Sequence, residues 1–287
     1  MTVVVKIGGA ATVDPEGTLA DVAALRSMDE TVVVVHGGST AMDQTLERLG
    51  IEPEYVETPS GVVGRFTDAE TMDVFKMVMP GLVNTDLVAG LHNQGVNAVG
   101  LSGVDGKLLT GPRKDAVRVL ENDKKKIRRG DHSGSITSVN AALLESLLAD
   151  GYTPVASVPM LGEESDGSYT PVNADADRSA AAIAGVLEGR LVLLTDTTGV
   201  YRDPDDPTTV IDRVEDPAGY RELKSVAKGF MGRKVMAAEE ALKGGAASVT
   251  IADANADEPI QSALAGAGTT ITADALPAAD EEGGIDA

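Results

Sequence analysis

Two short runs of valine constrain the fold of this chain more than any other feature. Val3–Val5 and Val32–Val35 are wholly apolar and β-branched. Neither run alternates apolar with polar residues, as a strand with one solvated face does. Strands without that alternation are typical of a parallel sheet whose two faces are both covered by helices. The chain is therefore predicted to build an α/β core around these two strands.

Both valine runs end at glycines, in Lys6–Gly9 and in His36–Ser39. Glycine permits a tight turn and lets backbone N–H groups approach a ligand closely. Ligands of open α/β sheets bind beyond the carboxyl ends of the strands, so this pair of loops, one with a lysine, predicts a phosphate site. His36 could contact that phosphate or pack beneath its loop, and the second interpretation is favoured. Ser39 is expected to cap the helix that ends at Leu49.

Apolar strands alternate with helical periodicities along the chain, which predicts an α/β fold. The expected architecture is a three-layer αβα sandwich with a mainly parallel, open sheet. Because no clear linker interrupts the sequence, only a soft boundary is placed near residue 186. We expect one lobe over residues 1–186, a second over 187–272, and a disordered acidic tail over 273–287.

One predicted helix offers two interpretations. Asp68 is expected to open it, and its apolar face is formed by Met72, Phe75, Val78 and Met79. This face is either part of the core or the contact face of a homodimer. The longest apolar runs of the chain are shorter than the roughly 20 residues that span a bilayer. A membrane-spanning protein is therefore not expected.

Composition excludes several kinds of chemistry. The 287 residues include no cysteine, which removes disulfides, thiolate catalysis and zinc–thiolate sites. The three histidines are scattered without metal-ligand spacing, so no metal site built by the protein is expected. The net charge of −21 argues against general nucleic-acid binding. Together with the few aromatic residues, it predicts a cytoplasmic protein adapted to a salt-rich, halophilic interior.

Lysines, glycine loops and carboxylates remain as the chemical repertoire, and this set suits phosphoryl transfer. That reaction depends on positioning and on neutralising charge on the migrating group. If a carboxylate is the acceptor, it is already ionised at neutral pH and needs no general base. Lys6 lies at the first glycine loop, and Lys234 lies near a predicted helix start, where amide dipoles favour phosphate.

Six motifs in this order resemble those of the amino acid kinase family, close to acetylglutamate kinase, over roughly residues 1–272. They are Lys6-x-Gly8-Gly9, His36-Gly37-Gly38, Arg65-Phe66-Thr67-Asp68, Asn173-x-Asp175-x-Asp177, Thr195-Asp196-x-x-Gly199-Val200 and Lys234-Val235. The resemblance implies the amino acid kinase fold, a carboxylate as phosphoryl acceptor, and ATP with Mg²⁺.

The same resemblance implies a role for each matching residue. Lys6 and Lys234 would stabilise the transferring phosphoryl group, and Asp177 would orient both lysines. The remaining positions divide into those implied to bind substrate and those implied to bind phosphate or nucleotide, and the amides of the glycines in both sets would hold phosphate oxygens. The first are Gly37, Gly38, Arg65 and Asn173; the second are Gly8, Gly9, Thr195, Asp196 and Gly199.

Two departures from the acetylglutamate kinase pattern, Ser39 and Asp175, resemble another branch of the family. That branch acts on aminoadipate or glutamate whose amine is capped by the C-terminal glutamate of LysW, a small acidic amino-group carrier protein. A basic segment, Lys107–Arg129, carries a net charge of +6 and is predicted to form β-hairpins. It would dock an acidic carrier; alternatively it is an ordinary solvated hairpin. The candidate docking residues are Arg113, Lys114, Arg118, Arg128 and Arg129.

Three further readings stay open at this point. The chain could be an acetylglutamate kinase that uses free substrate, or a non-catalytic regulatory module that docks a partner. The preference between glutamate and aminoadipate is also open, since one methylene changes binding by only about 1–3 kcal/mol. The family resemblance adds a homodimer to the expectations.

Overall fold

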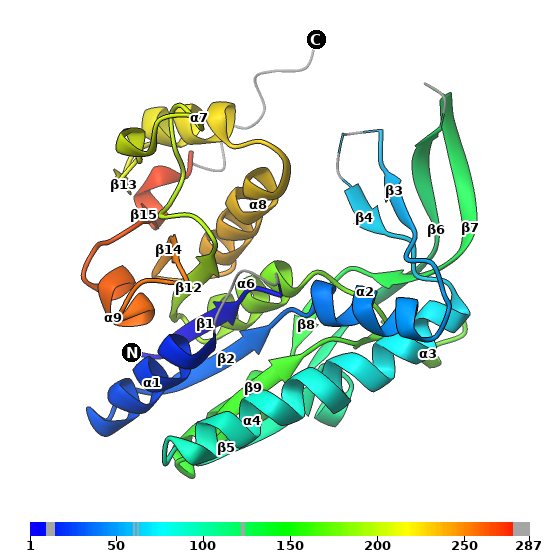
Figure 1. Cartoon of the computed structure of the whole chain (residues 1–287), viewed down its shortest axis with the longest axis horizontal. Coiled ribbons are helices and arrows are strands. Elements are labelled where there is room, and N and C mark those ends of the chain that lie inside the picture. Colours follow the sequence, from blue (N-terminus) through cyan, green and yellow to red (C-terminus); the bar gives the residue numbers. More distant parts are fainter. Residues whose placement is uncertain (10–14, 60, 62, 122–123, 278–287) are drawn as a thin grey trace.

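The computed structural model describes residues 1–9, 15–59, 61, 63–121 and 124–277 (Figure 1). Its centre is an eight-stranded sheet in the order β13-β15-β14-β12-β1-β2-β9-β5. Neighbouring strands are parallel except β14 and β15. The strands are β1 Val3–Ile7, β2 Val32–His36, β5 Ala98–Ser102, β9 Thr153–Ser157, β12 Arg190–Thr195, β13 Arg213–Val214, β14 Ser248–Asp253 and β15 Thr269–Thr272.

Helices cover both faces of this sheet, which confirms the predicted three-layer α/β fold. In β1, Val3 and Val5 pack into one core cluster while Val4 packs into another on the opposite face. The first face is covered by α1 Pro15–Ser27, α4 Asn84–Asn93 and α9 Pro259–Leu264. The opposite face is covered by α5 Ala141–Ala149, α6 Ala176–Val186, α7 Pro217–Val226 and α8 Gly229–Lys243.

The strands of the sheet divide at the pair β1–β12. Residues up to 186 supply β1, β2, β9 and β5, and residues after 186 supply β12, β14, β15 and β13. The first residues of the expected tail are ordered, because Ala273–Ala275 forms a 3₁₀ turn in which Ala275 is buried. Residues 278–287 of that tail lie outside the described residues.

The structure decides between the two interpretations of the apolar face on the helix that follows Asp68. Asp68 caps α3 (Ala69–Met77) by accepting a hydrogen bond from the Thr71 N–H, and a π-helical turn (Val78–Val83) joins α3 to α4. The predicted apolar face is buried within this chain, against Met42 and Leu46 of α2 (Ser39–Arg48). These four side chains are core, so they are not the dimer face that we considered.

Among the described residues, one helical run is long and apolar enough to cross a membrane by length and composition alone. It is Ala69–Asn93, which combines α3, the π-helical turn and α4. Core helices of globular proteins meet the same criterion, and α4 packs Leu87 and Leu91 beneath the sheet.

Two hairpins project from the same side of the molecule as α8 (Figure 1). One is β3 (Tyr55–Glu57) with β4 (Val63–Arg65). The other is the predicted basic hairpin, β6 (Leu109–Glu121) with β7 (Lys124–Gly134), whose expected turn at residues 122–123 lies outside the described residues. The second hairpin belongs to a separate sheet with β8 Ser138–Val139, β10 Met160–Glu163 and β11 Tyr169–Val172.

Candidate active site

The two glycine loops lie against each other at the carboxyl ends of β1 and β2. The Gly37 N–H donates to the Ile7 carbonyl at 3.0 Å, and the Thr40 N–H donates to the Gly9 carbonyl at 3.1 Å. A β-carbon on Gly9 would lie 2.2 Å from the Gly38 nitrogen, so only glycine fits there. The close approach brings the two glycine loops together at the carboxyl ends of these central strands, and the phosphate site predicted there stays a prediction.

Ser39 does not cap α2 with its side chain. The helix begins one residue earlier than expected, with Gly38 at the cap position. The Ser39 hydroxyl instead donates to the Gly9 carbonyl at 3.3 Å. The serine therefore joins the two loops rather than satisfying an N–H of the first helical turn.

His36 packs beneath its loop, as the favoured interpretation held. Its Nδ1 lies 2.9 Å from the Gly37 carbonyl and its Nε2 lies 3.0 Å from the Asn84 side-chain nitrogen. Asn84 donates also to the Val155 carbonyl. Burial lowers the pKa of His36 to about 4. The ring is therefore neutral at physiological pH, with Nδ1 donating and Nε2 accepting.

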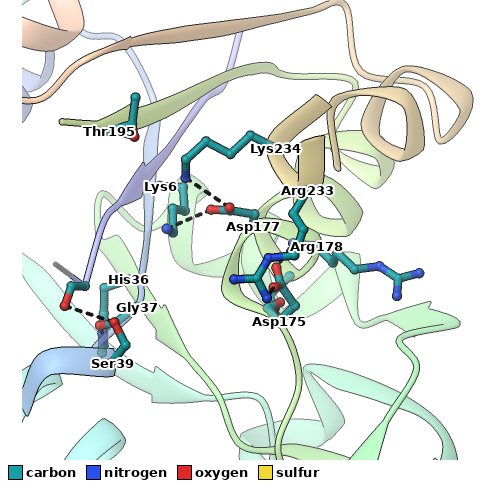
Figure 2. Close-up of polar contacts among 12 residues, drawn as sticks. Lys6, His36, Gly37, Ser39, Asp175, Asp177, Arg178, Thr195, Arg233 and Lys234 are labelled. Carbon is teal, nitrogen blue, oxygen red and sulfur yellow. Dashed lines mark hydrogen bonds and ion pairs between the residues drawn. The ribbon is translucent and has the colours of Figure 1, made fainter. Parts of the chain in front are cut away.

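Two lysines, one from strand β1 and one from helix α8, converge on one carboxylate (Figure 2). The Lys6 Nζ lies 2.7 Å from Asp177 Oδ1 as an ion pair, and the Lys234 Nζ donates to Asp177 Oδ2 at 3.1 Å. The exposed fractions of the three side chains are only 8%, 12% and 11% for Lys6, Asp177 and Lys234. We call these three residues the lysine–aspartate triad.

The local structure explains how the triad is assembled. Lys6 is the second-last residue of β1, Lys234 lies in the second turn of α8, and Asp177 lies in the first turn of α6, whose cap is Asp175. Burial alone would raise the pKa of Asp177, yet the two ammonium groups hold it well below the usual range. Burial, and then the positive charge of Lys6, lowers the pKa of Lys234. Two cations share one anion, so the site keeps a net positive charge.

Arg65 is held at the end of β4 by partners that the sequence did not reveal. Its guanidinium contacts Asp43 Oδ1 at 2.6 Å and donates to the Tyr55 hydroxyl at 2.8 Å. The guanidinium carbon lies 4.9 Å from the centre of the Tyr55 ring. Asp43 comes from α2 and Tyr55 from β3, and no local motif links these positions to Arg65.

Asn173 follows β11 and is fixed by a buried network. Its side-chain nitrogen donates to the Thr67 hydroxyl at 3.0 Å, and the Thr67 N–H donates to Asp131 Oδ1 at 3.1 Å. Thr67 and Asp131 are both buried. Asp131 also accepts a hydrogen bond from the Ser133 hydroxyl. The network orients Asn173 toward the same space as Arg65.

A cavity of about 660 Å³ brings most of the predicted site together. Its lining includes the triad, all four loop glycines, Arg65, Asn173, Thr195 and Asp196. Gly199 does not line it; a β-carbon there would lie 2.8 Å from the Thr269 hydroxyl, so this glycine serves close packing behind the site. Sequence analysis missed further polar lining residues: Asp43, Tyr55, Ser133, Arg178 and Arg233.

The five candidate docking residues lie on the second sheet, outside the cavity lining. Arg113 pairs with Glu164, and Arg128 pairs with Glu54 and stacks 3.8 Å from the centre of the Phe66 ring. These two arginines therefore hold the hairpin to the rest of the chain. The other three, Lys114, Arg118 and Arg129, are exposed.

Comparison with known proteins then identifies the family. The family model described as the amino acid kinase family matches residues 1–253. The chain belongs to the amino acid kinase family. It is accordingly a phosphotransferase, as the triad and the glycine loops indicated.

Relatives of this kinase include enzymes with two kinds of named substrate. The [LysW]-aminoadipate kinase of Thermus thermophilus is 42% identical over 275 residues, which cover 94% of this chain and 99% of the relative. That of Deinococcus radiodurans is 41% identical, with coverages of 94% and 91%. An acetylglutamate kinase of Methanopyrus kandleri is 41% identical, with coverages of 93% and 99%.

Solved structures agree on the fold. The N-acetylglutamate synthase of Neisseria gonorrhoeae superimposes with a TM-score of 0.74 at 24% identity, covering 98% of this kinase and 63% of that chain. The Giardia carbamate kinase superimposes with a TM-score of 0.66 at 16% identity, covering 94% and 98%. These likenesses establish the amino acid kinase architecture.

Proposed function

We propose that this kinase transfers the γ-phosphoryl group of ATP to the side-chain carboxylate of glutamate, aminoadipate or both, linked through the amine to a LysW-type carrier. The product is an acyl phosphate of arginine or lysine biosynthesis. The observation that carries the proposal is the lysine–aspartate triad beside two glycine loops, in one cavity with Arg65 and Asn173. The identities to [LysW]-aminoadipate kinases select the carrier-linked substrate.

Each residue has a defined task in this reaction. The Lys6 and Lys234 ammonium groups neutralise charge that develops on the migrating phosphoryl group, and Asp177 keeps them apart and oriented. The N–H groups of Gly8, Gly9 and Gly38 donate to phosphate oxygens in this proposal, whereas the Gly37 N–H already donates to the Ile7 carbonyl. Arg65, already oriented by Asp43, binds the substrate α-carboxylate. The acceptor carboxylate is ionised at neutral pH, so no general base is required.

ATP and Mg²⁺ fit the residues at the nucleotide end of the cavity. Thr195 and Asp196 line this end; Thr195 is the last residue of β12, in the half of the sheet built by residues 187–272, and Asp196 follows it. We propose that this half is the nucleotide-binding lobe and that residues 1–186 form the substrate lobe. Among the described residues, no group of three or more metal-ligating side chains occurs. Mg²⁺ is commonly held by substrate phosphates and water with one or two carboxylates, and Asp196 supplies one.

The carrier docks, in this proposal, on one face of the basic hairpin. The β6–β7 register places Arg118 opposite Ile127, and alternation puts Lys125 and Arg129 on the same face. All four are exposed, with 67% of Ile127 accessible. Over the paired residues 116–121 and 124–129, this outer face carries no carboxylate, because Glu121 lies on the other face, where it pairs with Lys126; the exposed Asp115 lies outside these pairs, at an irregularity of the register. A cationic surface with an apolar centre suits an acidic protein.

Trapping the acyl phosphate with hydroxylamine tests the proposed function. Carrier-linked glutamate, carrier-linked aminoadipate and free N-acetylglutamate are compared with ATP and Mg²⁺ in molar KCl. Turnover restricted to the carrier-linked substrates supports the proposal, and their ratio assigns the pathway. Efficient turnover of free N-acetylglutamate supports the alternative, an acetylglutamate kinase, which the identity to the Methanopyrus enzyme favours. If none of the substrates yields an acyl phosphate, the remaining alternative is a non-catalytic regulatory module.

Charge neutralisation tests the docking face separately. The double variant Arg118→Gln/Arg129→Gln is expected to weaken carrier binding about tenfold while leaving ATP binding unchanged. The matched control is Arg202→Gln/Arg213→Gln, two exposed arginines elsewhere with carboxylate partners of their own. At 1 M salt the Debye length is about 3 Å, so only contact pairs should contribute. Equal carrier affinity of the double variant and the wild type would refute this docking face.

We also propose a homodimer in a salt-rich cytoplasm, without a nucleic-acid partner. The face first considered for dimer contact, Met72 to Met79, is buried in the core. Met77 and Leu82 of the same helical run are, however, 63% and 48% exposed. They lie on the run that leads into α4, which packs on the edge strand β5. Light scattering in molar KCl tests the state, and a monomeric mass would contradict it.

A further inference from the structure

Arg233 is the cation of the active-site cavity with the weakest carboxylate contact. Among the residues that the structure describes, five cations line this cavity. Four of them have a carboxylate oxygen between 2.6 and 3.1 Å: Lys6, Arg65, Arg178 and Lys234. Arg233 Nη1 lies 3.9 Å from Asp175 Oδ2. Its charge is therefore the least compensated by the protein.

Arg233 lies at the opening of the cavity rather than at the reacting end. The neighbouring Lys234 turns inward to Asp177 with 11% of its side chain exposed, whereas Arg233 is 31% exposed (Figure 2). Its guanidinium carbon is 4.9 Å from the centre of the Phe230 ring, which is 72% exposed. The triad marks the reacting carboxylate, so the capped amine of the substrate must point toward this opening.

The guanidinium also reaches the strand that carries Arg65. Its Nη1 donates to the Val63 carbonyl at 3.2 Å, and Val63 precedes Arg65 by two residues on β4. Arginine has five N–H donors, and the Val63 carbonyl takes one of them. Arg65 and Arg233 thus line the same end of the cavity, with donors left for a planar anion.

A carrier-linked substrate brings a carboxylate that an acetylated substrate lacks. Glutamate has two carboxyl groups, and joining either one to the substrate amine leaves the other free and ionised beside the new amide. The linked substrate therefore presents two carboxylates near its capped amine, one on the substrate α-carbon and one on the carrier's terminal glutamate. An acetyl cap leaves only the first.

We propose that Arg233 binds the free carboxylate of the carrier's terminal glutamate and so selects carrier-linked over acetylated substrates. This inference rests on the proposed function. Arg65 serves the carboxylate common to both substrate types, and Arg233 serves the carboxylate that only the linked type has. Without that ligand, Arg233 keeps its contacts with Val63 and Asp175.

A substrate cycle tests the assignment. The variant Arg233→Met keeps an unbranched stem over Phe230 but removes the charge, and Arg233→Lys keeps a charge without the fork. Each enzyme is assayed with carrier-linked glutamate whose terminal carboxylate is free, and with the same conjugate carrying a carboxamide there. With the free carboxylate, R233M should lose about 10- to 100-fold in kcat/KM, mostly through KM. With the carboxamide, R233M and wild type should agree within about twofold, and R233K should be intermediate.

Other outcomes separate the inference from the function. If R233M loses the same factor on both conjugates, Arg233 only holds β4 or the nucleotide, and the specificity role is refuted. If wild-type enzyme phosphorylates neither conjugate, the proposed function fails and this inference fails with it. The control Arg202→Met changes an exposed arginine outside the cavity lining and should leave both rates unchanged.

Discussion

Replacing Asp177 with asparagine isolates the electrostatics of the lysine–aspartate triad. The substitution changes the charge of the site from +1 to +2 and leaves Lys6 and Lys234, both about nine-tenths buried, without their shared anion. Removing one partner of a buried ion pair costs about 3–5 kcal/mol. For a chain of this size, that is a fall in Tm of roughly 5–8 °C.

Two further effects follow from the same cause. A tetrahedral anion can replace the lost carboxylate, so inorganic phosphate should raise the Tm of Asp177→Asn more than that of the wild type. The pKa of Lys234 is already lowered by burial and by Lys6, and the variant removes the carboxylate that opposes this shift. Catalysis needs both lysines protonated. As pH rises, Asp177→Asn should therefore lose its activity at a lower pH than the wild type does.

Scanning calorimetry with and without 10 mM phosphate, together with the pH dependence of kcat, checks these results. Asp175→Asn is the matched control, because it removes the same charge two residues away, and asparagine can still accept the Arg178 N–H at the helix cap. The control should change Tm by less than about 3 °C. An Asp177→Asn variant with unchanged Tm and an ordinary phosphate response would refute the electrostatic account of the triad.

Three further results are expected. Because the folded chain keeps His36 neutral down to about pH 4 while the unfolded chain protonates it near 6.5, the stability present above pH 6.5 falls as pH drops. Urea unfolding should show a loss of about 2 kcal/mol from pH 6.5 to 5, and His36→Asn should remove this component. In urea unfolding, Asp21→Ala should lower the free energy of unfolding by about 2–4 kcal/mol. The reason is that buried Asp21 accepts hydrogen bonds from the Ile260 N–H and from the backbone N–H and side-chain nitrogen of Gln261. A change below about 0.5 kcal/mol would contradict this. Gly9→Ala should reduce kcat at least tenfold, because the added β-carbon forces the two glycine loops apart. The control Gly17→Ala adds a β-carbon with only ordinary contacts and should leave kcat unchanged. Equal kcat values for the two variants would show that catalysis does not need the close approach of the loops.

Local sequence patterns predicted the helices and strands of this kinase well where the structure of a segment depends only on residues within that segment. Uninterrupted valines mark strands buried on both faces, and β1 and β2 are fully buried. Asp68 is followed by a helix because its side chain satisfies an N–H only three residues away. The Ser39 cap failed because α2 begins at Ser39 itself, with Gly38 at the cap position, and the Ser39 hydroxyl donates to the Gly9 carbonyl 30 residues away.

Partners distant in sequence were beyond such patterns. The apolar stripe of α3 reads the same whether a second chain or α2 covers it, and only packing showed that α2 does. Arg65 carries no local sign of Asp43 or Tyr55, and no sequence pattern singled out Arg233 as a residue of the cavity. The sequence did not distinguish among the candidate docking arginines. The structure shows that Arg113 and Arg128 pair with carboxylates of this chain, and the strand register places Arg118 and Arg129 on the outer face of the hairpin.

By itself the sequence determined the kinds of element, the glycine turns, and the lysines and carboxylates available for phosphoryl transfer, because backbone preference and chemical type are local properties. Tertiary structure alone decided which of those groups meet. Lys6, Asp177 and Lys234 come from β1, α6 and α8, and they touch only because parallel strand order places β12 beside β1 and the helices over that face. Their charges and titration depend on that meeting, since each group is buried by segments far away in the chain.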